Sequence, residues 1–315
     1  MIEMKEVVKS FDGVRALDGL TLTVPTGSIF GLVGPNGAGK TTAISLITGV
    51  YRADSGTVAI DGQPVYDNTE AKKRVFCIYD DIYYHMSATT RDMKRLLAGL
   101  YPSFDEDRYT KLAAAFPEID ENTPLRRLSK GMVRQSAFWL AMSCRPEVLL
   151  LDEPVDGLDP VMRRRVWSLL ASDVAEYGTT VLLSSHNLRE LEDVCDHVGI
   201  LGKGKMLLER SLFDLQGNIT KVQILFNEDV GESADGAGEN AGGTAQTVLP
   251  PDIEVIHESS MGRMRTYILR LTMEEAQERL GALGPVYMEA LPLSLEEIFI
   301  YETGGADNVI QDILL

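Results

Sequence analysis

Short apolar runs separated by turn residues dominate the first part of the chain and predict β-strands. The runs before the first glycine-rich segment lie at 7–8, 20–24 and 29–33. Gly, Pro and Asp occupy the positions between these runs, as they do in turns. Residues 40–50 have the length and apolar spacing of a helix, and 52–66 predict a further pair of strands.

Longer segments follow, in which helical patterns alternate with apolar runs. Residues 88–145 are mostly helical in pattern. The continuous apolar run at 146–151 predicts a strand buried on both faces, as in a parallel sheet. The next predicted elements are helix, strand, helix and strand at 163–177, 179–183, 188–197 and 198–201. This alternation predicts an α/β fold.

The pattern changes near residue 215. Residues 231–247 are rich in Gly, Ala and acidic residues and poor in bulky apolar ones, so we predict a mobile loop there. Around it we predict strands at 221–226, 253–257, 264–271 and 286–291, and helices at 273–283 and 294–302. The chain therefore divides into a domain of residues 1–215 and a small α/β appendage of residues 216–315.

The charge balance argues against nucleic acid as a partner. The 315 residues include 47 acidic and 30 basic ones, a net charge of −17. Binding of a phosphate backbone needs a surplus of Lys and Arg. The acid excess is concentrated in 216–315, which hold 17 acidic and 5 basic residues, whereas 1–215 hold 30 and 25.

The sequence predicts neither a membrane span nor a signal peptide. The longest apolar stretches, such as 137–144, fall far short of the ~20 residues that a spanning helix needs. The first ten residues lack the apolar core of a signal peptide. Cys77, Cys144 and Cys195 are widely spaced and match no metal-binding pattern, which favours free thiols in a reducing compartment. We therefore expect a cytoplasmic protein.

The segment GPNGAGKT at 34–41 carries the clearest chemical signal. It fits the pattern G-x-x-x-x-G-K-[ST] and lies between a predicted strand and a predicted helix. The backbone N–H groups of such a loop and the positive end of the helix attract phosphate. We expect Lys40 to reach the β- and γ-phosphates, Thr41 to bind Mg²⁺ and Thr42 to help hold phosphate. The predicted ATP-binding loop residues before them are Gly34, Pro35, Asn36, Gly37, Ala38 and Gly39.

Two carboxylates follow the apolar run at 147–151. Asp152 and Glu153 are expected at the carboxyl end of a buried strand, where α/β sheets bind their ligands. Because adjacent residues on a strand end point differently, Asp152 can hold Mg²⁺ while Glu153 faces the attacking water. Taken alone, the pair is equally well explained as a strand capped by a solvated turn.

Three further motifs accompany these two. Leu128-Ser129-Lys130-Gly131-Met132 lies 23 residues before the strand end, counted from Ser129 to Asp152. The segment 155–160, VDGLDP, follows Glu153, and Ser185-His186 ends the next predicted strand. In this order and spacing, residues 2–215 resemble the ATP-binding-cassette (ABC) ATPases. The resemblance implies a P-loop NTPase fold with a RecA-like core, an antiparallel β subdomain and a helical subdomain at about 85–145.

The resemblance also implies roles for single residues. Phe11 would stack on adenine, although it fits an edge-strand or core position as well. Glu153 would polarise the hydrolytic water, and His186 would contact the γ-phosphate and that water. Asp159 would link the two sites of a head-to-tail dimer. The signature segment, LSGGQ in the family, would contact the ATP of the partner subunit through Ser129, Lys130, Gly131 and Met132.

Three positions depart from the family pattern. Lys130 and Met132 replace a Gly and the Gln of the signature, and Asp80 stands where the family has a Gln. An acid can ligate Mg²⁺ through water, but it cannot donate a hydrogen bond while it is ionised. We therefore expect Asp80 to join Thr41 and Asp152 around Mg²⁺, with weaker discrimination of ATP by this loop and with hydrolysis retained.

The resemblance implies an ATPase that uses ATP and Mg²⁺ to drive a separate integral-membrane permease. The partners would be that permease, received by the helical subdomain, and a second cassette in a homodimer or heterodimer, at the inner face of the cell membrane. The tail at 294–305 and the appendage resemble bacterial exporters of the drug or antibiotic class. Import remains open, and the sequence does not identify the substrate.

An alternative is a soluble ABC ATPase that acts on ribosomes or DNA and is not coupled to transport. The single cassette, the lack of a long coiled coil in the sequence and the acidic charge all count against it. The appendage is open to two interpretations, a cap that stabilises the dimer or a regulatory module that binds a small ligand.

Overall fold

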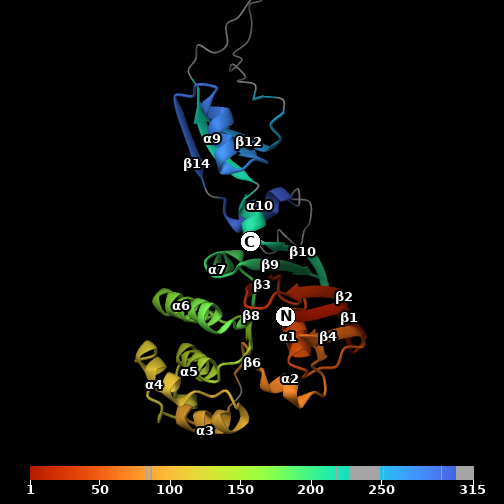
Figure 1. Cartoon of the computed structure of the whole chain (residues 1–315), viewed down its shortest axis with the longest axis vertical. Helices are drawn as coiled ribbons and strands as arrows, with labels where there is room; N and C mark the ends of the chain where they lie inside the picture. The colour runs from red at the N-terminus through yellow and green to blue at the C-terminus, as the bar shows by residue number, and fades with distance from the viewer. Residues whose placement is uncertain are drawn as a thin grey trace, which may run out of the picture. The chain divides into compact units, whose positions relative to one another are not determined.

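The computed structural model describes residues 1–82, 84–85, 87–217, 219–226, 249–250, 252–291 and 293–302. The chain divides into two compact units, one from Met1 to Arg210 and one that begins at Ser211 (Figure 1). The division falls a few residues before the predicted boundary near 215. The loop predicted at 231–247 lies outside the described residues.

The first unit is built on a six-stranded sheet. Across the sheet the strands are β10 (Lys205–Ser211), β9 (His197–Gly202), β3 (Ile29–Val33), β8 (Thr180–Ser185), β7 (Val148–Asp152) and β6 (Val75–Ile78). The five strands from β9 to β6 pair in parallel. Every residue of β3, β7 and β8 is buried, which explains why these segments are continuously apolar in sequence.

An antiparallel sheet covers the helix that follows the glycine-rich loop. Its strands, in spatial order, are β2 (Val14–Val24), β1 (Ile2–Phe11), β4 (Ser55–Ile60) and β5 (Gln63–Pro64). The helix α1 (Lys40–Ile47) shares one apolar core with both sheets, in which Leu22, Leu32 and Ile44 are completely buried. The start of α1 is therefore fixed by packing on both sides.

Helices complete the first unit. They are α2 (Thr69–Lys73), α3 (Thr90–Leu100), α4 (Glu106–Leu112), α5 (Lys130–Ser143), α6 (Pro160–Tyr177) and α7 (Leu188–Glu192), with 3₁₀ turns at Ala113–Ala115 and Leu125–Arg127. The helices α3, α4 and α5 lie together in a helical subdomain (Figure 1). Trp139 of α5 stacks on Tyr109 of α4, with ring centroids 4.5 Å apart, and donates a hydrogen bond to the Tyr109 carbonyl.

The helix that follows β8 ends well before the point that its pattern indicates. The helix predicted at 188–197 stops at Glu192, and β9 begins at His197. The reason is tertiary, because Asp196 bonds to the backbone of β3. Its carboxylate accepts a hydrogen bond from the Ile29 N–H at 3.0 Å, and its own N–H donates to the Ile29 carbonyl. These bonds draw the chain into the sheet before a second helical turn can form.

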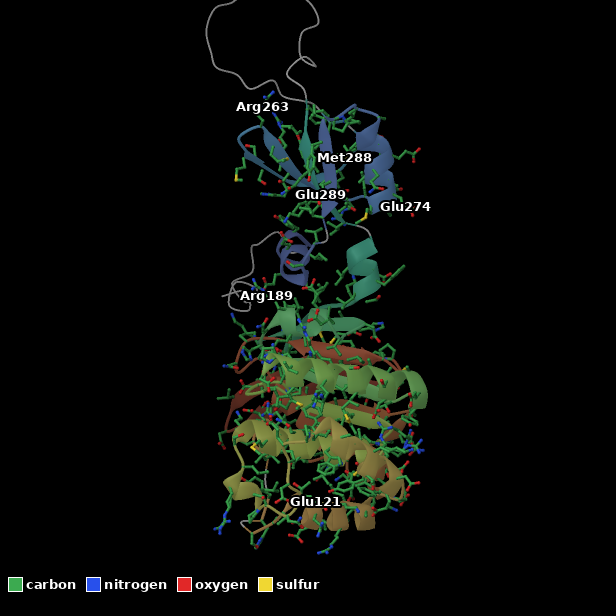
Figure 2. All side chains as sticks on the ribbon, turned by 90° about the vertical axis from the view of Figure 1, so that its left-hand side faces the viewer. Glu121, Arg189, Arg263, Glu274, Met288 and Glu289 are labelled. Carbon is green, nitrogen blue, oxygen red and sulfur yellow. The ribbon has the colours of Figure 1, made fainter. Side chains whose placement is uncertain are left out.

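The second unit is an antiparallel sheet with helices. The strands are β12 (Val255–Met261), β13 (Met264–Leu269), β11 (Thr220–Leu225) and β14 (Tyr287–Leu291), and the helices are α8 (Leu212–Gly217), α9 (Met273–Gly281) and α10 (Leu295–Glu302). The side chains of Ile224, Leu269 and Leu280 are completely buried in its core. Charged side chains such as Glu274 on α9 and Glu289 on β14 lie at its surface (Figure 2).

Candidate nucleotide site

The glycine-rich loop joins the carboxyl end of β3 to the start of α1. Gly39 has a left-handed φ of 111°, and a β-carbon there would lie 2.7 Å from the Ala16 carbonyl oxygen. A β-carbon on Gly34 would overlap the Leu201 carbonyl oxygen. A residue with a side chain would clash at either position, so the loop can lie this close to its neighbours only with glycine.

Lys40 is buried beneath this loop, with 5% of its surface exposed. Its ammonium group donates a hydrogen bond to the Gly34 carbonyl at 2.6 Å. The same nitrogen lies 3.3 Å from Glu153 Oε1. A buried ammonium needs such partners, because burying an unpaired charge costs several kcal/mol. The positive charge is therefore held between the loop and the end of β7.

Asp152 is buried at the end of β7, with 3% of its surface exposed, and both of its oxygens are bonded. Thr41 Oγ1 donates to Asp152 Oδ2 at 2.7 Å, and Ser184 Oγ donates to Asp152 Oδ1 at 2.6 Å. Ser184 also accepts a hydrogen bond from the Glu153 N–H at 3.1 Å. Sequence reasoning gave Ser184 no role. The signal for it lies in the sheet, where Ser184 is paired in register with Asp152.

Glu153 has an unusual backbone conformation for a residue with a side chain, a φ of 48°. Such a conformation costs of the order of 1 kcal/mol and persists only where the surroundings hold it. Its N–H is bonded to Ser184, and its carbonyl accepts a hydrogen bond from Arg134. Its side-chain oxygen Oε2 lies 2.9 Å from His186 Nδ1. The structure thus brings together Glu153, His186 and Lys40, as the sequence predicts.

Lys40 and Glu153 are among the residues that line a cleft of about 380 Å³. It is lined by Ala16, by every residue from Pro35 to Thr42, and by Asp80, Asp152 and Glu153. Phe11 is not among the residues that line it. It lies at the end of β1, partly exposed, with its ring edge-to-face against Tyr51 at 5.0 Å. Stacking of Phe11 on adenine stays a prediction.

The signature segment contacts the loop that follows β7 and does not line this chain's own cleft. Ser129 is the N-cap of α5, and its hydroxyl accepts a hydrogen bond from the Met132 N–H. A β-carbon on Gly131 would lie 2.7 Å from the Gly157 carbonyl oxygen, so the close contact there requires glycine. Contact with a nucleotide on a second subunit stays a prediction for Ser129, Lys130, Gly131 and Met132.

Asp159 caps the next helix. Its carboxylate accepts hydrogen bonds from the N–H groups of Val161 and Met162, at 2.9 and 3.0 Å. Capping of this kind stabilises a helix by about 1 kcal/mol. The structure therefore gives Asp159 a role within the subunit, and its predicted role between subunits stays a prediction.

Asp80 lines the cleft but is engaged in ion pairs. Its Oδ1 lies 3.0 Å from Lys130 Nζ and 2.6 Å from Arg134 Nη2. Partial burial alone would raise the pKa of Asp80, but hydrogen bonds from Lys130 and Arg134 lower this pKa below its ordinary value. The pKa of Lys130 is raised by hydrogen bonds to Asp80 and Asp156. Both groups are therefore charged at neutral pH.

Arg134 is a second residue that sequence reasoning missed. Only 1% of its surface is exposed, and its guanidinium group bonds to the Glu153 carbonyl and to both the carbonyl and carboxylate of Asp80. The sequence places it in the segment 88–145, which is mostly helical in pattern, and does not single it out. Only the burial of its charge indicates that it holds the two sides of the cleft together.

The donor set at this edge of the sheet fits Mg²⁺. The Thr41 hydroxyl and the Asp152 carboxylate supply oxygen ligands, which Mg²⁺ prefers. Within the part of the chain that the structure describes, no group of three or more His, Cys, Asp or Glu residues could hold a metal ion. A magnesium ion here would therefore need phosphate oxygens and water to complete its coordination, as it usually does beside a nucleotide.

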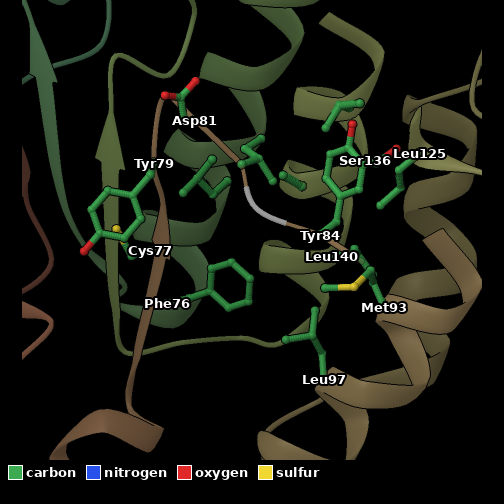
Figure 3. A pocket seen from close by; sticks show the side chains of 14 residues that line it. Phe76, Cys77, Tyr79, Asp81, Tyr84, Met93, Leu97, Leu125, Ser136 and Leu140 are labelled. Carbon is green, nitrogen blue, oxygen red and sulfur yellow. The ribbon is translucent and has the colours of Figure 1, made fainter. Parts of the chain in front are cut away.

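A second cavity, of about 260 Å³, lies between β6 and the helices α3 and α5 (Figure 3). Its walls are largely apolar and include Phe76, Tyr84, Met93 and Leu140, whereas Asp81 is the one carboxylate among its lining residues. Among the described residues that line it there is no Lys or Arg, so this cavity is unsuited to phosphate.

A glycine-rich loop before a helix, a buried lysine and a carboxylate pair at the end of a parallel strand define a P-loop ATPase. Residues 17–156 match the family model for the ABC transporter. The ABC transporter ATP-binding protein YtrB of Bacillus subtilis is 32% identical over 97% of this chain and 99% of its own length. The chain therefore belongs to the ATP-binding proteins of ABC transporters.

Other relatives and solved structures agree. The daunorubicin/doxorubicin resistance ATP-binding protein DrrA of Streptomyces peucetius is 31% identical over 69% of this chain and 67% of its own length. The Nod factor export ATP-binding protein I of Burkholderia lata is 32% identical over 66% and 70%. A solved ATP-binding subunit of an ABC transporter shares the fold with a TM-score of 0.64 and 27% identity, over 69% of this chain and 92% of that one.

A dimeric ATP-binding cassette bound to ADP and phosphate matches with a TM-score of 0.61 at 21% identity, over 67% of this chain and 99% of that one, which shows a common fold. The predicted fold class and the predicted ATPase activity are confirmed. The protein is an ABC ATPase that hydrolyses ATP and energises an ABC transporter, in a family whose cassettes dimerise and pair with permease subunits. Among the described residues, no helix has both the length and the apolar character needed to cross a membrane.

Proposed function

We propose that Glu153 is the general base that polarises the hydrolytic water. The observation that carries this proposal is the 2.9 Å contact between Glu153 Oε2 and His186 Nδ1, beside the phosphate-binding loop. Because Lys40 lies 3.3 Å from the other oxygen of Glu153, the carboxylate is held between two nitrogen atoms. A base held in this way needs little reorganisation when the water is activated.

The remaining site residues bind and orient. Backbone N–H groups of the loop at 34–39 and the ammonium group of Lys40 would hold the phosphates. Thr41 and Asp152, which already share a hydrogen bond, would hold Mg²⁺. When bound, Mg²⁺ would neutralise charge on the phosphate oxygens. Ser184 bonds to the Asp152 carboxylate and to the Glu153 N–H. These bonds would orient Asp152 toward Mg²⁺ and Glu153 toward the water.

We propose further that two cassettes close head to tail around two ATP molecules. The signature segment supports this, because Ser129 and Gly131 are not among the residues that line this chain's own cleft, and Gly131 lies against Gly157 in the loop after β7. The partner cassette is either a second copy of this chain or a related subunit. Closure would bind ATP between the subunits, and hydrolysis of ATP to ADP and phosphate would reopen the dimer.

We propose that the transporter exports a small molecule, with this subunit at the inner face of the cell membrane. Two relatives support export by their names, the daunorubicin/doxorubicin resistance protein DrrA and the Nod factor export protein. The apolar cavity between β6, α3 and α5 supports a contact there with an apolar segment of the permease (Figure 3).

Co-purification tests this proposal. The full chain, isolated from its own cells in detergent, should carry a polytopic membrane protein with it. Met93→Glu places a charge in the apolar cavity and should reduce that co-purification, whereas Leu96→Glu, on an exposed position of the same helix, should not. Isolation without any polytopic partner would favour an ATPase that is not coupled to transport. Vesicles with the reconstituted complex should move the substrate away from the ATP side.

A further inference from the structure

Two of the positions at which this chain departs from the signature and glutamine pattern of its family lie side by side. Asp80 stands in place of a Gln, and Lys130 stands in place of a Gly. In the structure the Asp80 Oδ1 and the Lys130 Nζ are 3.0 Å apart. A Gln and a Gly could not form this ion pair, so each of the two departures gives the other its partner.

The pair is part of a larger network of charges. Lys130 Nζ also lies 3.2 Å from Asp156 Oδ2, in the loop after β7. Asp80 Oδ1 lies 2.6 Å from Arg134, which in turn bonds to the Glu153 carbonyl. Three segments are thereby joined, the loop after β6, the start of α5 and the loop after β7.

The burial of each charged side chain indicates which of these contacts is strongest. The side chains of Lys130, Asp80 and Asp156 are about half exposed, so the Lys130 contacts are individually weak. Arg134 is almost fully buried and its charge needs an anionic partner. Asp80 supplies that partner and at the same time holds Lys130. It is therefore the residue through which the signature segment is tied to the buried charge beneath the cleft.

These contacts also pair the charge of the Asp80 carboxylate and the charge of the Lys130 ammonium group within the subunit. A carboxylate that already binds a lysine and an arginine is poorly placed to attract Mg²⁺, because its charge is neutralised within the subunit. The ammonium group of Lys130 lies between two carboxylates of its own chain.

We propose that Asp80 is a positioning residue: with Lys130 and Arg134 it fastens the signature segment to the loops of the nucleotide site, and it does not ligate Mg²⁺. The proposal rests on the ATPase activity of the family and replaces the expectation that Asp80 joins Thr41 and Asp152 around the metal.

A double-mutant cycle in the full chain tests it. The variants are Asp80→Asn, Lys130→Met and the two together, with Lys130→Arg as the conservative replacement. The readouts are kcat and KM for ATP with Mg²⁺ and, without turnover, equilibrium binding of a fluorescent ATP analogue as Mg²⁺ is varied. Loss of a metal ligand should raise the Mg²⁺ concentration that nucleotide binding requires. Loss of a positioning residue should lower kcat and leave that concentration unchanged.

We expect Lys130→Met to lower kcat about 3-fold, since an exposed ion pair is worth at most about 5-fold in an equilibrium. Asp80→Asn should lower kcat about 10-fold, because it also leaves the buried Arg134 without its anionic partner. The double variant should be no slower than Asp80→Asn alone, because the interaction is already lost. Lys130→Arg should stay within about 2-fold of the unaltered protein. The Mg²⁺ concentration that gives half-maximal nucleotide binding should stay within about 2-fold in every variant.

The control is the exposed pair Lys73–Glu70 in α2, 2.7 Å apart and outside the site. Lys73→Met and Glu70→Gln should leave kcat unchanged. The proposal is overturned if Asp80→Asn raises the Mg²⁺ requirement for nucleotide binding 5-fold or more while Lys130→Met does not. Independent losses that multiply in the double variant would overturn it as well.

Discussion

The carboxyl edge of the parallel sheet contains buried charged side chains, whereas the second unit has charged side chains that are exposed at its surface. At the sheet edge Lys40 and Asp152 are buried, and each is bonded to neighbours on other elements. In the second unit Glu274 and Glu289 are exposed to solvent (Figure 2). Because burying a charge is costly unless it is paired, a protein retains buried charges mainly where a task requires them. The difference indicates that the functional site lies at the sheet edge.

The two sheets also differ in how completely their strands are buried. Strand β7 is buried along its whole length, whereas β11 alternates between buried and partly exposed positions. A parallel sheet covered on both faces leaves only its strand ends for polar chemistry. Charged residues in the second unit, such as Lys221 and Glu297, form ion pairs near the surface. We therefore expect mutations to act on chemistry in the first unit and on local stability in the second.

The largest expected effect is at Glu153. Glu153→Gln keeps the size of the side chain but removes the base, so kcat should fall about 100-fold to 10,000-fold. ATP should still bind, and the variant should accumulate as an ATP-bound dimer in gel filtration. Glu147→Gln, at the other end of the same strand where Glu147 pairs with Arg74, should leave kcat unchanged. Retained hydrolysis in Glu153→Gln would rule out the assignment of the base.

A pair of core substitutions separates the two units. Leu150→Ala in β7 and Leu269→Ala in β13 each remove a completely buried side chain, and each should cost about 2–5 kcal/mol of local stability. Faster hydrogen exchange should appear in the unit that carries the change. Leu150→Ala should also weaken ATP binding, because β7 positions Asp152, whereas Leu269→Ala should keep kcat within about 2-fold. Val14→Ala, at an exposed position, serves as the control. Loss of ATPase activity in Leu269→Ala would mean that the second unit supports the site.

Phe11 offers a smaller test at the edge of the first unit. If it stacks on adenine, Phe11→Ala should weaken ATP binding about 5-fold to 150-fold, since an aromatic–base contact is worth about 1–3 kcal/mol. Phe11→Trp should preserve binding. Phe213, an exposed phenylalanine of the second unit, provides the matched control, and Phe213→Ala should bind ATP normally. Titration with a fluorescent ATP analogue measures all three, and equal affinities would remove Phe11 from the site.

The smallest effect is expected for an ion pair of the second unit. Lys221→Met breaks the 2.6 Å contact with Glu297, and partly exposed pairs contribute at most about 1 kcal/mol. Denaturant unfolding should show a loss of that size or less, with kcat unchanged. A loss of several kcal/mol would show that the surface charges of the second unit matter as much as those of the first.

Local sequence patterns predict much of the secondary structure and domain organisation of this protein. The loop at 34–41, the apolar run before Asp152 and the pattern changes after residue 215 predict a P-loop α/β domain followed by a small α/β unit. Residues a few positions apart settle such features, because helix and strand periods, turn residues and loop motifs all depend on near neighbours.

Only the tertiary structure decided which groups meet. Thr41 bonds to Asp152 across 111 residues of chain, and Ser184, on a neighbouring strand, bonds to the Asp152 carboxylate and to the Glu153 N–H. The fold brings Asp80 into the same cleft as Thr41 and Asp152 and also against Lys130 and Arg134, two partners that the sequence did not indicate. The helix at 188–192 ends early because Asp196 finds partners in β3. Such contacts depend on strand order and burial, which bring distant residues within hydrogen-bond reach and leave no periodic trace in the sequence.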